Sequence, residues 1–172
     1  MKFFNKLASA SFSVVLGFVG IQGQAKAATV NLTDFAPQIS SGQNFSFTFS
    51  PVEESDGTDG IFTIRARGDY SLGDAQTESL SGVIDGVVSQ TQVTATPQNL
   101  IYSAYGSDNL WEQSFVIDGL DMIDITSDST VTFWLDLLDD VHFSIYQQNT
   151  FVEVSLQYES KSISQSIPEP AS

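Results

Sequence analysis

Alternation of apolar and polar residues with a period of two constrains the fold of this chain more than any other feature. In residues 45–50, three phenylalanines at every second position alternate with serine and threonine, which is the pattern of a strand with one buried face. The alternation recurs in residues 61–70, 131–138 and 152–158, and more weakly in residues 76–84, 87–95, 111–117 and 142–147. In residues 131–138 the second face is also partly apolar, so we expect this strand to be central and covered on both sides.

Turn signals separate these segments, among them the Asp-Gly pairs at 85–86 and 118–119. After residue 27, no window of twelve or more residues shows the periodicity of a helix, and no repeat of fixed length is evident. Many short strands in a chain of 172 residues predict one all-β domain. We expect an antiparallel β-sandwich of jelly-roll type over residues 28–159.

The first 27 residues have the three parts of a secretory signal peptide. Lys2 and Lys6 give the positive start, residues 7–21 form a short apolar stretch, and small residues at Ala25 and Ala27 suit cleavage after Ala27. The apolar stretch is too short and too interrupted for a comfortable membrane span. The segment therefore predicts export to the cell surface or the extracellular space.

The charge of the remaining chain excludes several partners. After residue 27 there are 21 acidic and three basic side chains, a formal charge of −18. Such a chain repels nucleic acid and anionic lipid headgroups, so we expect no nucleic-acid partner. Cysteine is absent, which excludes disulfides, thiolate metal sites and a cysteine nucleophile.

The loop at residues 53–60 is the best candidate for a cation site. Its carboxylates at Glu54, Asp56 and Asp59 are closely spaced, and glycine follows each aspartate. Calcium takes six to eight oxygen ligands, often from a tight loop bent at glycine. A second acidic run contributes further candidates: Asp118, Asp121, Asp124 and Asp128. The alternative is that these Asp-Gly pairs simply form turns.

Aromatic side chains suggest a second kind of site, in which sugar rings stack. Tyr102 and Tyr105 lie in a loop-like stretch suited to a binding rim, and Trp111 follows nearby. We therefore predict Tyr102, Tyr105 and Trp111 as glycan-binding residues. The alternative for Trp111, and equally for Trp134, is packing within or between strands.

Residues for catalysis are scarce. His142 is the one histidine and follows the acidic turn at Asp139 and Asp140, where we expect a surface residue. No Gly-x-Ser-x-Gly motif is present, and a zinc site needs several His or Cys ligands. We expect the protein not to be an enzyme. The alternative is a glycan-active enzyme that uses a pair of carboxylates.

Residues 160–172 read as a serine-rich linker that ends in Pro168-Glu169-Pro170-Ala171-Ser172. With the signal peptide, this end resembles PEP-CTERM proteins, an exported class of Gram-negative bacteria and cyanobacteria that make exopolysaccharide. The resemblance implies that Pro168, Glu169 and Pro170 form a sorting motif read by an exosortase-type membrane enzyme. The family's tail continues into a membrane helix and a basic cluster, and neither follows Pro170 here. We therefore expect no stable membrane span after signal removal.

These observations together predict an exported, non-enzymatic protein of the cell surface or extracellular matrix. Its expected role is structural or adhesive, with extracellular polysaccharide and calcium as the candidate ligands.

Overall fold

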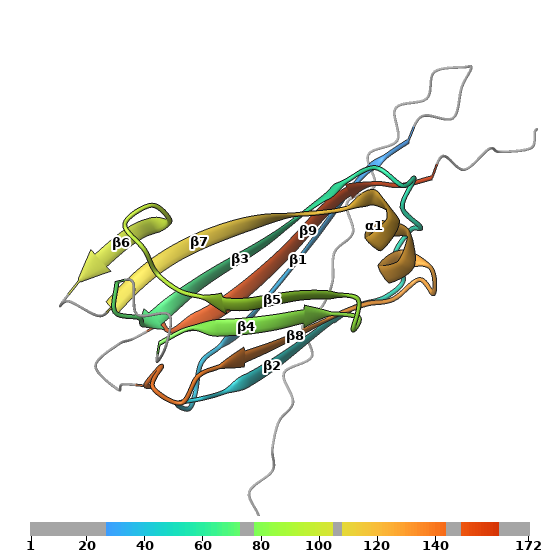
Figure 1. Cartoon of the computed structure of the whole chain (residues 1–172). Helices are drawn as coiled ribbons and strands as arrows, with labels where there is room; N and C mark the ends of the chain where they lie inside the picture. Colours follow the sequence, from blue (N-terminus) through green and yellow to red (C-terminus); the bar gives the residue numbers. More distant parts are fainter. Residues whose placement is uncertain (1–26, 73–77, 105–107, 144–148, 162–172) are drawn as a thin grey trace, which may run out of the picture.

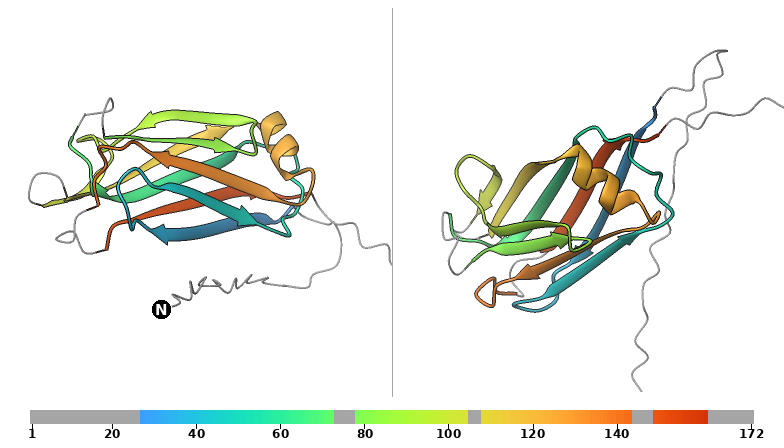
Figure 2. Two further views of the ribbon diagram at one scale, coloured as in Figure 1. Left: turned by 90° about the horizontal axis from the view of Figure 1, so that it is seen from below. Right: turned by 45° about the vertical axis from the view of Figure 1, so that its right-hand side comes forward.

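The computed structural model describes residues 27–72, 78–104, 108–143 and 149–161, which form two antiparallel sheets packed face to face (Figures 1 and 2). The five-stranded sheet has the order β1 (Thr29–Pro37), β9 (Phe151–Glu159), β3 (Gly60–Asp69), β7 (Asp108–Ile117) and β6 (Leu100–Ala104). The four-stranded sheet has the order β2 (Asn44–Phe49), β8 (Val131–Leu137), β4 (Leu80–Ile84) and β5 (Val88–Val93). A short helix, α1 (Gly119–Thr126), lies at the end of the sandwich between β7 and β8.

Strand pairing follows the jelly-roll arrangement. The first strand pairs with the last, β2 pairs with β8, β3 with β7, and β4 with β5. The chain is therefore a long hairpin folded over on itself, and these paired strands alternate between the two sheets. β6 is an additional edge strand beside β7. The predicted all-β antiparallel sandwich is confirmed.

The core lies between the two sheets and is built from the alternating apolar positions. Phe62 of β3 and Phe133 of β8 stack with ring centroids 5.0 Å apart, and Phe49 meets Phe133 edge-on at 5.6 Å. All three side chains are buried. Because β3 and β8 belong to different sheets, the Phe62–Phe133 stack joins the two layers directly, and aromatic pairs of this geometry add stability beyond the area they bury.

The strongest alternating segments became strands where the sequence predicts them, namely β2, β3, β8 and β9. Two strands, β1 and β6, were not predicted. Residues 142–143, from a weakly predicted strand, are not in a strand, and residues 144–148 lie outside the described part. β8 is central as expected, but its outer face is open, so the prediction that both faces are covered is wrong.

The helix α1 also departs from expectation, because Asp118-Gly119 begins a helix where a turn was predicted. The Asp118 side chain caps the helix by accepting a hydrogen bond from the Leu120 backbone N–H. Eight residues give little more than two turns, which is too short for a helical period to stand out in the sequence. No helix in the described ranges is long and apolar enough to cross a membrane.

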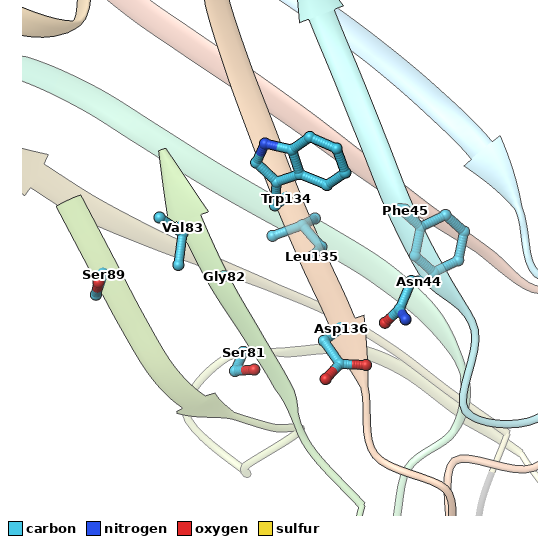
Figure 3. A pocket seen from close by; sticks show the side chains of 9 residues that line it. All are labelled: Asn44, Phe45, Ser81, Gly82, Val83, Ser89, Trp134, Leu135 and Asp136. Carbon is cyan, nitrogen blue, oxygen red and sulfur yellow. The ribbon is translucent and has the colours of Figure 1, made fainter. Parts of the chain in front are cut away.

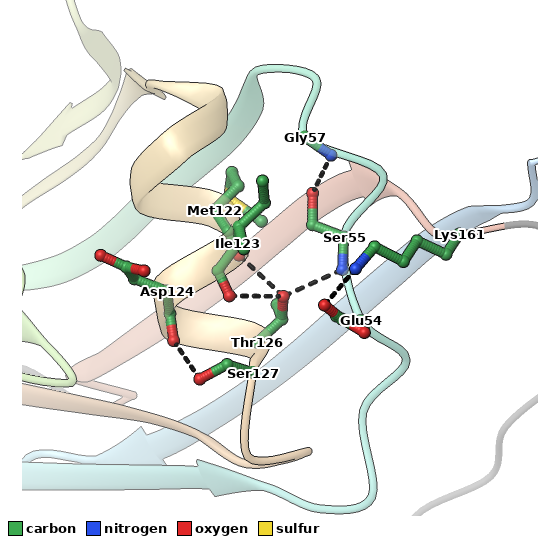
Figure 4. Close-up of polar contacts among 9 residues, drawn as sticks. All are labelled: Glu54, Ser55, Gly57, Met122, Ile123, Asp124, Thr126, Ser127 and Lys161. Carbon is green, nitrogen blue, oxygen red and sulfur yellow. Dashed lines mark hydrogen bonds and ion pairs between the residues drawn. The ribbon is translucent and has the colours of Figure 1, made fainter.

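The loop before β3 holds α1 in place (Figure 4). The Ser55 backbone N–H donates to Thr126 Oγ1 at 2.9 Å, and the Gly119 N–H donates to Asp59 Oδ1 at 3.0 Å. A Cβ at Gly119 would lie 2.8 Å from the Gly57 carbonyl carbon and still closer to its oxygen. Helix and loop thus meet backbone to backbone, which a side chain at residue 119 does not allow.

Tyr70 allows a test of the core at the opposite end of the sandwich. Its fully buried ring meets Trp111 edge-on at 5.4 Å, and its hydroxyl has no hydrogen-bond partner within the described part of the chain. Burial also raises the pKa of Tyr70. We expect Tyr70→Phe to increase the free energy of unfolding by about 1 kcal/mol, because it removes a buried hydroxyl without breaking a bond. Urea denaturation of the full chain measures this change.

Tyr158→Phe is the matched control. The Tyr158 hydroxyl donates to the Glu53 carbonyl oxygen at 2.6 Å, so its removal should cost about 1 kcal/mol. Equal destabilisation by both variants would show that the Tyr70 hydroxyl has a partner after all.

Candidate functional site

The outer face of the four-stranded sheet carries an exposed tryptophan at its centre. Along β8, Phe133 and Leu135 point into the core, and Trp134 and Asp136 point outward. Trp134 is 59% exposed although β8 lies between β2 and β4. At this position the indole offers a flat apolar surface to a ligand.

Short side chains surround the indole ring. Trp134 is paired with Ser46 on β2 and with Val83 on β4, and Val83 is paired in turn with Ser89 on β5. None of these neighbours is tall enough to cover the ring. An open hollow of about 430 Å³ lies beside it, lined by residues of all four strands (Figure 3).

Polar side chains form a second row next to the ring. Asp136 lies two residues after Trp134 on the same face and is paired with Asn44 on β2 and Ser81 on β4. Figure 3 shows these three side chains on one side of Trp134. We call the surface made by Asn44, Ser46, Ser81, Val83, Ser89, Trp134 and Asp136 the Trp134 face.

The Trp134 face combines one flat apolar ring with several hydrogen-bonding groups. Binding sites for small molecules have this composition, in which apolar surface supplies affinity and a few polar groups fix orientation. A sugar presents the same two features, a face of C–H groups and a rim of hydroxyls. The arrangement therefore suits stacking of a sugar ring on the indole, with hydrogen bonds to Asp136, Asn44 and Ser81.

Of the three residues predicted to bind glycan, the structure describes two, and only one of these is exposed. Tyr102 is 48% exposed on β6, at an edge of the five-stranded sheet, where the Arg67 guanidinium lies 5.5 Å from its ring centroid. Tyr105 lies outside the described residues. Trp111 has 0% exposure and packs in the core. This burial corrects the expectation for Trp111, because its ring offers no face to a ligand in solution.

The sequence contains a signal for the exposure of Trp134, a residue for which sugar stacking and strand packing were both open. Trp134 shares its face of the strand with Thr132 and Asp136, and polar neighbours on one face indicate exposure. The partly apolar character of that face led instead to the expectation of a covered strand.

The three candidate cation ligands of the acidic loop each contact a different residue. Asp56 Oδ1 accepts hydrogen bonds from the backbone N–H and hydroxyl of Thr58, which lower its pKa. Asp59 Oδ1 accepts from Gly119, and Glu54 forms an ion pair with Lys161 (Figure 4). The loop thus stabilises the end of the sandwich through turn formation and helix docking.

No group of three or more His, Asp or Glu side chains in the described ranges is placed to hold a metal ion. In the second acidic run, Asp118 caps α1, and Asp128 Oδ1 accepts a hydrogen bond from the Thr130 N–H. Calcium binding therefore stays a prediction from the sequence.

His142 lies on the surface, as predicted. Its Nδ1 is 3.6 Å from Asp69 Oδ2, and its side chain is exposed. The sorting motif Pro168, Glu169 and Pro170 lies outside the described residues.

Two carboxylates are among the residues that line a smaller hollow of about 250 Å³ at the end of the five-stranded sheet. Asp59 and Glu159 line it together with Thr29 and Ile61. Thr29 Oγ1 donates to Glu159 at 2.6 Å, and Asp59 accepts from Gly119. Both carboxylates are therefore already engaged in hydrogen bonds that fix the local structure.

Asp85 lies at the turn between β4 and β5. Among the described carboxyls whose pKa departs clearly from the ordinary value, it is the one whose pKa is raised. Its partial burial raises the pKa above 3.8, a hydrogen bond from the Thr132 N–H opposes this, and the nearby charge of Asp128 adds to it. The other oxygen, Oδ2, is buried without a hydrogen-bond partner in the described residues. Ionised Asp85 therefore costs stability at neutral pH.

Asp85→Asn should raise the melting temperature at neutral pH. A carboxyl with a higher pKa in the folded state binds its proton more tightly there, so stability falls as pH rises from 3.8 toward the raised value. The gain from the amide should shrink as pH falls below about 4, where both states of the wild type become protonated. Thermal melts over this pH range test it, with the exposed Asp140→Asn as control. A gain that is independent of pH would contradict the assignment.

Comparisons with protein-family models and with curated proteins give no match, so the functional conclusions rest on the residues themselves.

Proposed function

We propose that this protein is an exported, non-enzymatic component of the cell surface or extracellular matrix that adheres to polysaccharide through the Trp134 face. The observation that carries the proposal is the exposed Trp134 ring beside a hollow lined with polar groups. Its position among short side chains leaves the ring open to a flat ligand. A structural role in the core, the usual use of a strand tryptophan, does not account for this exposure.

The predicted targeting segments support the location. Residues 1–27 have the pattern of a signal peptide, and the tail carries the PEP-type motif that implies an exosortase-type enzyme. Thr29 pairs with Glu159 at the start of β1 and the end of β9, so both segments join the domain at one end (Figure 1). The tail leaves the domain from β9 of the five-stranded sheet, and the Trp134 face belongs to the other sheet.

Affinity electrophoresis tests the proposal. The full chain is run through gels that contain a panel of soluble polysaccharides, beside Trp134→Ala and Phe35→Ala. Phe35 is 65% exposed on the outer side of β1, in the five-stranded sheet. We expect retardation of the wild type and of Phe35→Ala, and its loss in Trp134→Ala. Equal retardation of all three proteins, or of none, would refute this use of the face.

Calcium is a second proposed ligand, with Glu54, Asp56 and Asp59 as its candidate residues. A ligand at 100 times its dissociation constant stabilises the folded state by about 2.7 kcal/mol, or roughly 5–10 °C for a domain of this size. A shift of that order on adding calcium, reversed by chelator and reduced in Asp56→Ala, would establish the site. An unchanged melting temperature would leave these carboxylates with the structural contacts described above.

The alternative function is a glycan-active enzyme with two carboxylates. The favouring observation is that Asp59 and Glu159 line one hollow. Release of reducing ends from the same polysaccharides, abolished in Glu159→Gln, would support catalysis and displace the adhesive proposal. Intact polymer after prolonged incubation would remove the alternative for those polymers.

A further inference from the structure

The charge of the four-stranded sheet limits the class of glycan that its outer face can hold. The sequences of β2, β8, β4 and β5 contain no lysine, arginine or histidine. The three basic side chains after residue 27 are elsewhere: Arg65 and Arg67 on β3 of the other sheet, and Lys161 beyond β9. The Trp134 face therefore has no positive charge of its own.

Asp136 is the one ionisable side chain among the residues that line the hollow. It is exposed, and it lies on the same face of β8 as Trp134, two residues away. A carboxylate or sulfate on a sugar stacked against Trp134 would come close to Asp136, and no neighbouring base would offset the repulsion. Like charges placed together in this way act against binding.

The basic residues on the rest of the domain do not restore a positive field. Arg67 makes a two-pronged contact with Asp108, at 3.0 and 2.8 Å. Arg65 lies 3.8 Å from Glu153, and Lys161 pairs with Glu54. With a formal charge of −18 after residue 27, the domain repels polyanions at a distance as well as at the site.

We propose that the glycan bound by the Trp134 face is a polysaccharide without acidic groups, held by stacking and by hydrogen bonds to its hydroxyls. This inference rests on the proposed function and specifies its ligand. The polar row suits such a ligand: the Asp136 carboxylate accepts hydrogen bonds, the Asn44 amide donates and accepts, and the Ser81 hydroxyl does both. None of these contacts requires a charge on the sugar.

Affinity electrophoresis at low and high salt, with chelator present, tests the inference. The gels contain uncharged β-linked glucan, galactan and mannan, a polyuronate, or a glucosamine polymer with free amines. We expect the wild type to bind at least one of the polymers without acidic groups. Binding of an uncharged one should have nearly the same affinity at both salt concentrations, because no ion pair is formed. Binding to the polyuronate should be at least about tenfold weaker.

Charge variants at residue 136 provide the matched comparison. Asp136→Asn removes the charge but keeps a hydrogen-bond acceptor, so it should reduce the discrimination against the polyuronate. Asp136→Lys should gain affinity for the polyuronate at low salt and lose it at high salt, because it adds the missing base.

Two failures are distinguishable. Trp134-dependent binding of the polyuronate in preference to all the other polymers would overturn the inference and leave the proposed function intact. The same holds if polyuronate binds preferentially once calcium replaces chelator. If no polymer binds, or if binding persists in Trp134→Ala, the proposed function fails and the inference fails with it.

Discussion

Trp134→Ala should weaken binding to the polysaccharide by at least about 30-fold. An aromatic residue at the centre of an interface commonly contributes 2 kcal/mol or more, and each 1.4 kcal/mol is a factor of ten in affinity. The change should hardly affect folding, because the ring is 59% exposed and makes no contact between the two sheets. We expect the free energy of unfolding to change by less than about 1 kcal/mol, the range of strand preferences at an exposed position. Affinity electrophoresis and urea denaturation measure the two quantities.

Trp134→Phe tests whether binding needs an aromatic ring of any size or the larger indole. A smaller aromatic ring should recover part of the lost affinity, because its flat face can still meet a sugar. Phe35→Ala removes a similarly exposed aromatic ring from the other sheet and should leave binding unchanged. If the alanine variant at 134 lost stability to the same degree as affinity, the ring would be a structural residue, and the Trp134 face would lose its main support.

Gly119→Ala should destabilise the domain by about 3 kcal/mol or more. An added Cβ would lie 2.8 Å from the Gly57 carbonyl carbon. A backbone group cannot rotate away as a side chain can, so the helix must separate from the loop. Separation would break the bonds from Ser55 to Thr126 and from Gly119 to Asp59. The expected loss corresponds to a decrease of roughly 10 °C in melting temperature.

The sign of this effect distinguishes packing from helix preference. Alanine favours a helix over glycine by about 1 kcal/mol, so without the contact the substitution would be neutral or stabilising. The adjacent Leu120 is 75% exposed, and Leu120→Ala should change stability by less than about 0.5 kcal/mol. A gain in stability for Gly119→Ala would show that helix and loop do not meet as described.

The alternation of apolar and polar residues along the chain was enough to establish the all-β class and the four strongest strands. Alternating phenylalanines in β2 require one buried face, and a chain with several such strands must pack two sheets to bury them. The Asp85-Gly86 pair likewise forms the turn that its residue types predict, with positive φ angles of 46° and 72°. These features depend on backbone preferences and on residues near in sequence.

The helix at Gly119 was decided by contacts far apart in the chain. Asp118-Gly119 is typical of a turn, but some sixty residues earlier Asp59 accepts a hydrogen bond from the Gly119 N–H, and the Gly57 backbone packs against residue 119, the first of the helix. The same loop was expected to hold calcium because its carboxylates are close in sequence. In the fold they make separate contacts, since adjacent side chains in a loop need not point the same way.

The two tryptophans show most directly what the sequence alone did not decide, namely which face of a strand is buried. Trp111 and Trp134 both lie in strands, and alternation indicates which residues share a face of each strand. It does not settle which face points inward when both contain apolar residues. Polar neighbours on the same face favour exposure of Trp134, but Trp111 also has polar neighbours on its face, Asn109 and Gln113, and is buried. Pairing of β7 with β3 placed Trp111 between the sheets, and pairing of β8 with β2 and β4 placed Trp134 on the open side. The sequence determined a sandwich with two strand tryptophans, and the packing of the sheets decided which one is available to bind, because burial depends on the partner strands.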